Sequence, residues 1–137
     1  MLKIEHIGIA VKELSSSIAL YEKLLNSPCY KTEMVETEQV NTAFFQKGET
    51  KIELLESTAS DGPIEKFIEK KGEGIHHIAF EVENLDTFAA HAAEKGYPLS
   101  DGPTVSSSGS KFAFIDAPEG YEIELIERRP DTPRFPV

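Results

Sequence analysis

Two histidines and two glutamates recur at one spacing in the two halves of this 137-residue chain. The segment IEHIGIAVKEL at 4–14 resembles IHHIAFEVENL at 75–85, and KIELLE at 51–56 resembles EIELIE at 122–127. The offset of 71 residues that places His6 on His77 also places Glu53 on Glu124. Self-similarity at a fixed offset indicates an internal duplication. Each copy carries one imidazole and one carboxylate.

These four side chains could bind a metal ion together. In the strand expected at 3–11, His6 lies opposite the apolar face, because the side chains of a strand alternate. The same alternation places the three other candidates opposite the apolar faces of their strands. Imidazole and carboxylate ligands suit Zn²⁺, Ni²⁺, Co²⁺, Mn²⁺ or Fe²⁺. We therefore predict one divalent metal ion with four protein ligands, which leaves two octahedral positions for water or a chelating substrate: His6, Glu53, His77 and Glu124.

The other histidines, and the glutamates discussed below, are not expected to be metal ligands. His76 is adjacent to His77, but its partner in the repeat is Glu5 and it faces the helix side of the strand. His91 falls in the second predicted helix and is expected to be exposed. The glutamates at 56, 81, 122 and 127 are interpreted as surface charges, which is the usual state of strand glutamates.

The predicted fold class is α+β, with two tandem βαβββ modules. Module 1 covers about 1–56, a linker with a helix at 63–71 covers about 57–74, module 2 covers about 75–129, and 130–137 form an extended tail. Because one module of about 55 residues buries little apolar surface, both are expected to form one domain. The strands are predicted at 3–11, 29–36, 39–47, 50–56, 75–83, 97–100, 111–116 and 121–127.

Two module helices are predicted at 14–26 and 85–95. Ser15–Ser17 can cap the start of the first helix. An apolar stripe at helical spacing is expected to face the sheet in each of them. The stripe of the first helix is Ile18, Tyr21, Leu24 and Leu25, and that of the second is Leu85, Phe88, Ala89 and Ala92.

Composition and charge exclude several classes of protein. Lys and Arg number 14 against 24 Asp and Glu, for a net charge of −10, so nucleic acid and anionic membranes are not expected partners. The single cysteine, Cys29, permits neither an intrachain disulfide nor a cysteine zinc cluster. The N-terminus does not read as a signal peptide, and no apolar run approaches the roughly 20 residues of a membrane span. A soluble cytosolic domain is expected.

The sequence resembles the vicinal oxygen chelate (glyoxalase/bleomycin resistance/dioxygenase) superfamily up to about residue 129. That superfamily builds a metal cleft between curved mixed sheets from paired βαβββ modules. Within it, the methylmalonyl-CoA epimerases are the most similar, through IEHIGIAVKEL, NTAFFQKGETKIELLE and PIEKFIEKKGEGIHHIAFEV. The resemblance implies the ligands His6, Glu53, His77 and Glu124 around one Co, Zn, Ni or Mn ion, and it implies a homodimer.

Two segments depart from the epimerase pattern. DAPEGYEIELIE at 116–127 is more similar to glyoxalase I, which also uses His, Glu, His and Glu. Some epimerases are thought to carry a second, non-ligand Glu as base, but QVNTAFF at 39–45 has no carboxylate at the matching place, near Ala43.

The resemblance implies epimerisation of a 2-substituted malonyl-CoA thioester. The cation would stabilise the enolate as a Lewis acid, with Glu124 as ligand and possible base and Glu53 as its opposite number. The alternatives are a glyoxalase I-like lactoylglutathione lyase and a non-catalytic binding member of the superfamily. The segment 106–111, SSSGSK, either donates hydrogen bonds to an anionic substrate group or is a flexible loop between strands.

Overall fold

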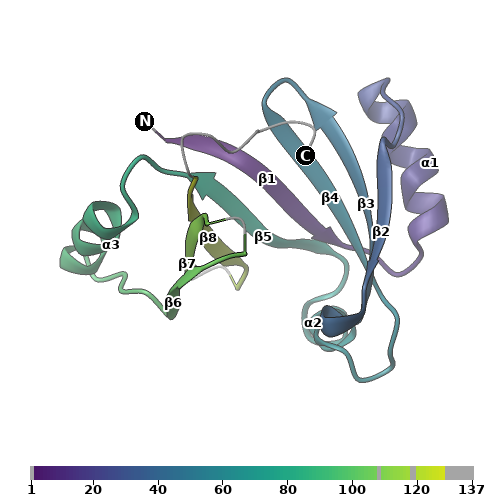
Figure 1. The fold of residues 1–137 in the computed structure, drawn as a ribbon. Coiled ribbons are helices and arrows are strands. Elements are labelled where there is room, and N and C mark those ends of the chain that lie inside the picture. Colours follow the sequence, from purple (N-terminus) through teal and green to yellow (C-terminus); the bar gives the residue numbers. More distant parts are fainter. Residues whose placement is uncertain (1, 108, 118–119, 129–137) are drawn as a thin grey trace. The chain divides into compact units, whose positions relative to one another are not determined.

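The computed structural model describes residues 2–107, 109–117 and 120–128 and divides the chain into two compact units. The first module here denotes the unit His6–His76. The second module denotes the N-terminal residues through Glu5 together with the segment that starts at His77. The α+β class and the repeated βαβββ order are confirmed (Figure 1).

The two modules have the same elements in the same order. The first contains β1 (Lys3–Ala10, whose first residues belong to the second module), α1 (Leu14–Leu25), β2 (Lys31–Val35), the 3₁₀ turn Glu36–Glu38, β3 (Val40–Lys47) and β4 (Thr50–Ser57), followed by α2 (Pro63–Lys71). The second contains β5 (Gly74–Glu81, which begins in the first module), α3 (Leu85–Glu94), β6 (Asp101–Val105), β7 (Lys111–Asp116) and β8 (Glu122–Glu127).

Strand pairing is also repeated. In the first module the order is β2-β3-β4-β1, with β1 parallel to β4 and the other pairs antiparallel. In the second module the order is β5-β8-β7-β6, with β5 parallel to β8 and the other pairs antiparallel. Each module is therefore a four-stranded mixed sheet in which the first and last strands lie side by side.

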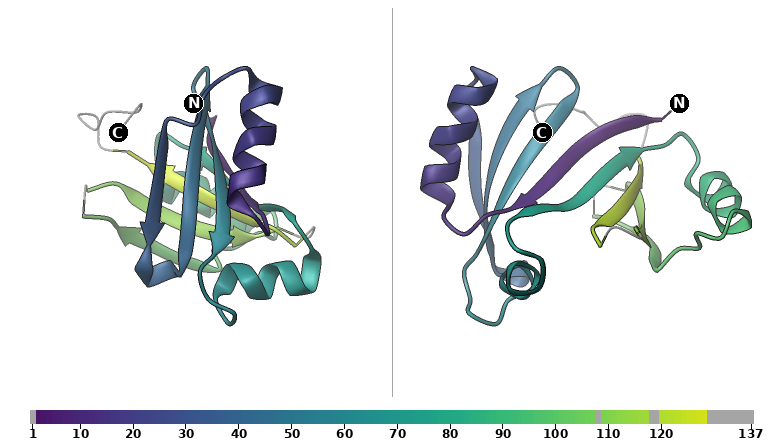
Figure 2. Two further views of the ribbon diagram at one scale, coloured as in Figure 1. Left: turned by 90° about the vertical axis from the view of Figure 1, so that its right-hand side faces the viewer. Right: turned by 180° about the vertical axis from the view of Figure 1, so that it is seen from behind.

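Helices cover both faces of the first module's sheet (Figure 2). The α1 stripe packs on Phe45 and Leu54, and α2 covers the opposite face at Ala10 and Leu55. The stripe prediction is correct for three residues, Ile18, Tyr21 and Leu25. It is wrong for Leu24, which is 67% exposed. Leu24 is displaced by about 100° around the helix from Leu25 and so faces away from the sheet.

A glutamate from the last strand of each module accepts a hydrogen bond from the N-terminus of that module's helix. The prediction that Ser15–Ser17 cap the first helix is therefore wrong. No side-chain cap is made at the Glu13 N-cap position, where Ser15–Ser17 were expected to act. The Leu14 N–H instead donates to Glu56 at 2.9 Å, and the Leu85 N–H donates to Glu127 at 2.7 Å. A carboxylate is favourable there because it satisfies an orphan amide and faces the positive end of the helix dipole. Glu56 and Glu127 are therefore structural caps and not surface charges.

The strand predicted at 97–100 is wrong, because β6 begins at Asp101. Leu99 of this segment packs on the core of the second module without being part of a strand. The actual strand, DGPTV, is exposed throughout its length and lies at the sheet edge. Proline and glycine are tolerated at edges, where a missing donor or side chain costs little.

The predicted tail at 130–137 lies outside the described residues. None of the helices among the described residues combines the length and the hydropathy that a membrane span requires.

We predict that Glu127→Ala lowers the free energy of unfolding by about 1–2 kcal/mol, because an amide at the start of α3 loses a charged acceptor. Glu127→Gln, which keeps an acceptor oxygen, should lose less. The matched control is Glu122→Ala, an exposed glutamate of the same strand, with an expected change within about 0.5 kcal/mol. Urea denaturation followed by circular dichroism measures all three. Equal losses for the Glu127→Ala and Glu122→Ala variants would show that the cap contributes nothing.

Candidate metal centre

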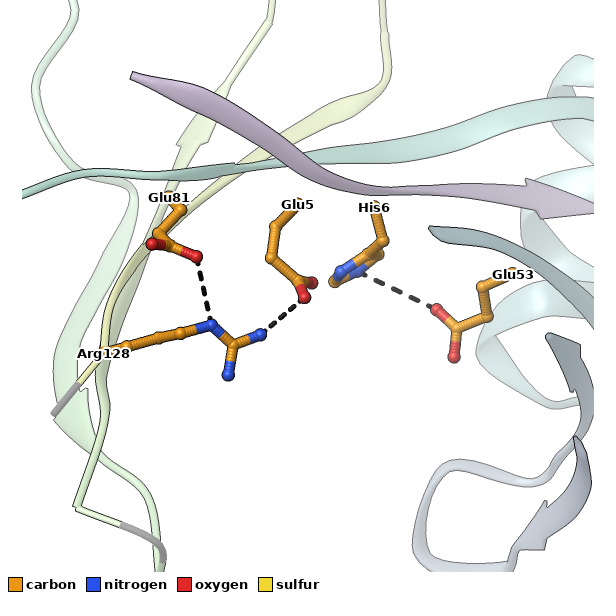
Figure 3. A network of polar contacts seen from close by, with 5 residues as sticks. All are labelled: Glu5, His6, Glu53, Glu81 and Arg128. Carbon is orange, nitrogen blue, oxygen red and sulfur yellow. Dashed lines mark hydrogen bonds and ion pairs between the residues drawn. The ribbon is translucent and has the colours of Figure 1, made fainter. Parts of the chain in front are cut away.

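The parallel pairing of β1 with β4 places His6 beside Glu53. His6 is opposite Lys51 and Gly8 is opposite Glu53, so both candidate ligands emerge on one face of the sheet. His6 Nε2 lies 3.9 Å from Glu53 Oε1, and the two side chains are 17% and 18% exposed. Figure 3 shows the imidazole and the carboxylate directed toward one another. Two ligand atoms that share a metal at about 2.1 Å are at most about 4.2 Å apart, so this pair fits a common ion.

The second module repeats this register. His77 is opposite Glu122 and Ala79 is opposite Glu124, each 71 residues after its counterpart in the first module. His77 and Glu124 are both partly buried. The duplication seen in the sequence is therefore reproduced in the hydrogen-bond register, and each module presents one imidazole and one carboxylate in the same relation.

His77, the residue directly after His76, belongs to a group that could bind a metal. One ligand atom from each of His6, Glu53 and His77 lies within 4.8 Å of the other two. Glu124 is not in this group among the described residues, and its assignment as a ligand remains a prediction from the repeat. Two imidazoles and a carboxylate, all partly buried, are a donor set suited to a divalent transition metal.

His76 and His91 have other surroundings. The ring of His76 contacts Phe67 of α2 edge-on, with centroids 4.9 Å apart. Since neighbouring residues of a strand project to opposite faces, His77 points away from that contact. His91 is exposed on α3, as predicted. Of the adjacent histidines, His77 is the one placed to be a ligand.

A phenylalanine beside each candidate carboxylate was missed in the sequence. Phe44 of β3 is opposite Glu53, and Phe114 of β7 is opposite Glu124, so each ring shares a face with its carboxylate. The sequence does contain this repeat. TAFF at 42–45 resembles FAFI at 112–115, and the two segments align when the offset is 70 residues instead of 71. An apolar flank lowers the local dielectric and strengthens interactions between charges near the carboxylates.

Two lysines bring positive charge to the ligand face of the first module. Lys31 is opposite Phe44, and its ammonium lies 5.3 Å from the centre of that ring. Lys51 is opposite His6 and, two residues before Glu53, shares its face. Lys31 Nζ also lies 3.8 Å from Glu33 Oε1 on the same strand, so its charge is partly neutralised.

An arginine of the second module pairs with one buried and one partly buried carboxylate. Arg128 donates from Nε to Glu81 Oε1 at 3.1 Å and from its terminal nitrogen to Glu5 (Figure 3). Glu5 is 3% exposed and Glu81 is 13% exposed. Glu81 is therefore not a surface charge, whereas Glu122 is exposed as predicted. Glu5 immediately precedes His6, so this network fixes the strand that leads into a candidate ligand.

The segment 106–111 leads from β6 into β7, which begins at Lys111, and Ser108 within it lies outside the described residues. The Gly109 N–H donates to the carbonyl of Ser106 at 2.9 Å. Lys111 pairs with Asp86 of α3 at 3.2 Å. The Lys111–Asp86 pair engages the one cation of the segment, and the choice between an anion-binding segment and a loop stays a prediction.

Comparison with known proteins identifies the class to which this fold and site belong. The model of the Glyoxalase/Bleomycin resistance protein/Dioxygenase superfamily matches residues 5–114. The chain belongs to this superfamily.

Individual relatives share nearly the whole chain. The uncharacterized protein YqjC of Bacillus subtilis (strain 168) is 39% identical over 134 residues, 96% of each chain. Mitochondrial methylmalonyl-CoA epimerase of Bos taurus is 30% identical over 127 residues, covering 90% of this chain and 73% of that one. A methylmalonyl-CoA epimerase solved in complex with methylmalonyl-CoA and NH4+ is similar in structure, with a TM-score of 0.72 at 31% identity, covering 95% of this chain and 96% of that one.

We predict that His77→Ala weakens binding of Co²⁺ or Zn²⁺ by at least about tenfold, since it removes one imidazole ligand. The matched control is His76→Ala, which removes the neighbouring imidazole and should bind as the wild type does. Isothermal titration of both metal-free variants measures the difference. Equal losses would show that the wrong histidine of the pair has been assigned.

Proposed function

We propose that the protein is a divalent-metal-dependent epimerase of a 2-substituted malonyl-CoA thioester. The observation that carries the proposal is the His–Glu pair that both modules hold in one strand register. The relatives named as methylmalonyl-CoA epimerases support the substrate class. As part of the same proposal, the two modules act as one domain, and the enzyme is a cytosolic homodimer.

The ligands in this proposal are His6, Glu53, His77 and Glu124, around Co²⁺, Zn²⁺, Ni²⁺ or Mn²⁺. When bound, the cation would supply Lewis-acid stabilisation of the negative charge that develops when the substrate loses its Cα proton. The residues present fit such an ion, because neutral imidazole and carboxylate oxygen are the donors these metals take in proteins.

The chain's own carboxylates would move the proton. Epimerisation requires removal of the Cα proton on one face and its return on the other. Glu124 is the proposed base, and Glu53, its counterpart in the repeat, is the proposed acid on the opposite face. A carboxylate has two oxygens, so one can bind a cation while the other holds a proton.

The neighbours of the carboxylates have supporting roles. Phe44 and Phe114 flank Glu53 and Glu124, and their rings would exclude water that could otherwise exchange with the transferred proton. Lys31, which is also paired with Glu33, and Lys51 would offer cations to the anionic thioester at the ligand face of the first module.

A second candidate is a glyoxalase I-like lactoylglutathione lyase. It is favoured by the segment 116–127, which is more similar to glyoxalase I than to the epimerases, and by the same four ligand types. Its chemistry also moves a proton next to a chelated oxygen. A non-catalytic binding member of the superfamily is disfavoured, since such a protein has no need of four ligands.

Proton exchange separates the candidates. We predict that the metal-loaded protein in D₂O introduces deuterium at Cα of methylmalonyl-CoA and interconverts its epimers, as measured by mass spectrometry and chiral analysis. Chelation of the metal should abolish this exchange. The hemithioacetal of glutathione and methylglyoxal should remain unchanged under the same conditions.

Variants test the roles within the same assay. Glu124→Gln should reduce exchange by about 100-fold or more, the range for loss of a general base. The matched control is Glu122→Gln on the same strand, which should leave the rate unchanged. Thioester formation from the glutathione adduct without exchange in methylmalonyl-CoA would move the assignment to the lyase. No turnover of either substrate by the metal-loaded protein would favour the binding class.

A further inference from the structure

The two modules carry opposite charges at matching positions of their ligand faces, the sheet faces from which the candidate histidine and carboxylate emerge. Three positions on the strands beside the candidate ligands can be matched by their register. They are Lys51, Gln46 and Lys31 in the first module and Glu122, Asp116 and Asp101 in the second. Two cations and an amide in one module thus correspond to three carboxylates in the other.

Two of these positions lie in the row of each sheet that contains the histidine. His6 is opposite Lys51, and Lys51 is opposite Gln46. The equivalent row of the second module consists of His77, Glu122 and Asp116. Residues that are opposite one another in register share a face of the sheet, so these side chains flank the histidines.

The third position lies in the row that contains the carboxylate. Glu53 is opposite Phe44, and Phe44 is opposite Lys31. The equivalent row of the second module consists of Glu124, Phe114 and Asp101. The candidate ligands are therefore repeated with the same chemistry, whereas the charge around them is not repeated. Unequal surroundings of this kind allow the two ends of one bound molecule to be distinguished.

Lys51 is the nearer of the two lysines to the candidate ligands of the first module. It lies on the strand next to His6 and two residues before Glu53, which is about 6.6 Å along the strand. Its side chain is half-buried and ends in an ammonium group with three donors. Lys31 lies two strands away from Glu53 and pairs with Glu33 at 3.8 Å. Lys51 is therefore the lysine placed to contact a molecule held at His6 and Glu53.

We propose that Lys51 binds the free carboxylate of the substrate's acyl group and so determines which carbonyl group lies on the side of the first module. This inference rests on the proposed function. A 2-substituted malonyl thioester has two carbonyl groups on Cα, an anionic carboxylate and a neutral thioester. The duplicated ligands are of one chemical kind and do not distinguish these groups, whereas a cation present at only one of two matching positions does. The phosphates of CoA are joined to the thioester by a long arm, so the acyl carboxylate is the anion closest to the ligands.

Malonate supplies this carboxylate without CoA, and its binding is measured without turnover. Isothermal titration of the Co²⁺-loaded wild type is expected to give one malonate per chain. Lys51→Met removes the charge while nearly keeping the length of the side chain, and it should weaken malonate binding by at least about tenfold. Lys51→Arg keeps the charge and should lose less. The matched control is Lys47→Met, an exposed lysine of β3, which should bind as the wild type does.

Moving the cation to the second module tests the asymmetry. In the double variant Lys51→Met/Glu122→Lys, the cation stands beside His77 in the register that Lys51 has beside His6. Because malonate has two identical ends, this double variant should recover malonate binding relative to Lys51→Met. Lack of recovery would contradict the assignment of the two ends of the substrate.

CoA without an acyl group is the probe for the phosphates. If Lys51→Met weakens binding of CoA and leaves malonate binding unchanged, the cation meets a phosphate and the proposal is wrong. Failure of the Co²⁺-loaded wild type to bind malonate, or loss of Co²⁺ from Lys51→Met, would also overturn the proposal. Deuterium exchange in methylmalonyl-CoA together with malonate binding that does not depend on Lys51 would overturn this inference alone. Malonate binding that depends on Lys51, without exchange, would support a carboxylate ligand at Lys51 and overturn the proposed function instead.

Discussion

The pairing of the first and last strand of each module is the constraint on which the site depends. A parallel pair in which His6 is opposite Lys51 places Glu53 on the same face and on the neighbouring strand. The pair β5 and β8 repeats this register, so His77 and Glu124 stand in the same relation. A shift of one residue in either pair would turn a ligand to the opposite face of the sheet. The candidate site therefore depends on two strand registers more than on any single contact.

Charged side chains away from the candidate ligands, buried or partly buried, support these registers. Glu56 and Glu127 tie the start of each helix to the last strand of its own module. Arg128 joins the end of β8 to Glu5 of β1 and Glu81 of β5, just before His6 and at the end of the His77 strand. Breaking a buried pair by removing one partner leaves an uncompensated charge, which costs several kcal/mol. These side chains hold the strands in place without touching a candidate ligand.

The sequence predicted the features that depend on residues close together in the chain and missed contacts between residues far apart in it. The His–Glu pairs, the fold class and most elements follow from alternation and from a repeat that can be read along the chain. Glu56 and Glu127 were misjudged because each acts on an amide 42 residues away, and Arg128 was missed because its partner Glu5 is 123 residues away. The strand β6 was misplaced because an exposed edge strand carries no apolar alternation. Phe44 and Phe114 were missed because they are separated by 70 residues, one fewer than the offset that relates the candidate ligands.

The central claim is that the two copies of the His–Glu pair serve one metal ion. The most direct measurement is the stoichiometry and affinity of Co²⁺ binding to the metal-free wild type and to His6→Ala. We predict one tightly bound ion per chain in the wild type and binding weaker by at least about tenfold in the variant, because one of the four ligands of the single ion is lost. Two ions per chain, with one retained after His6→Ala, would show that each module binds its own ion and would contradict the account.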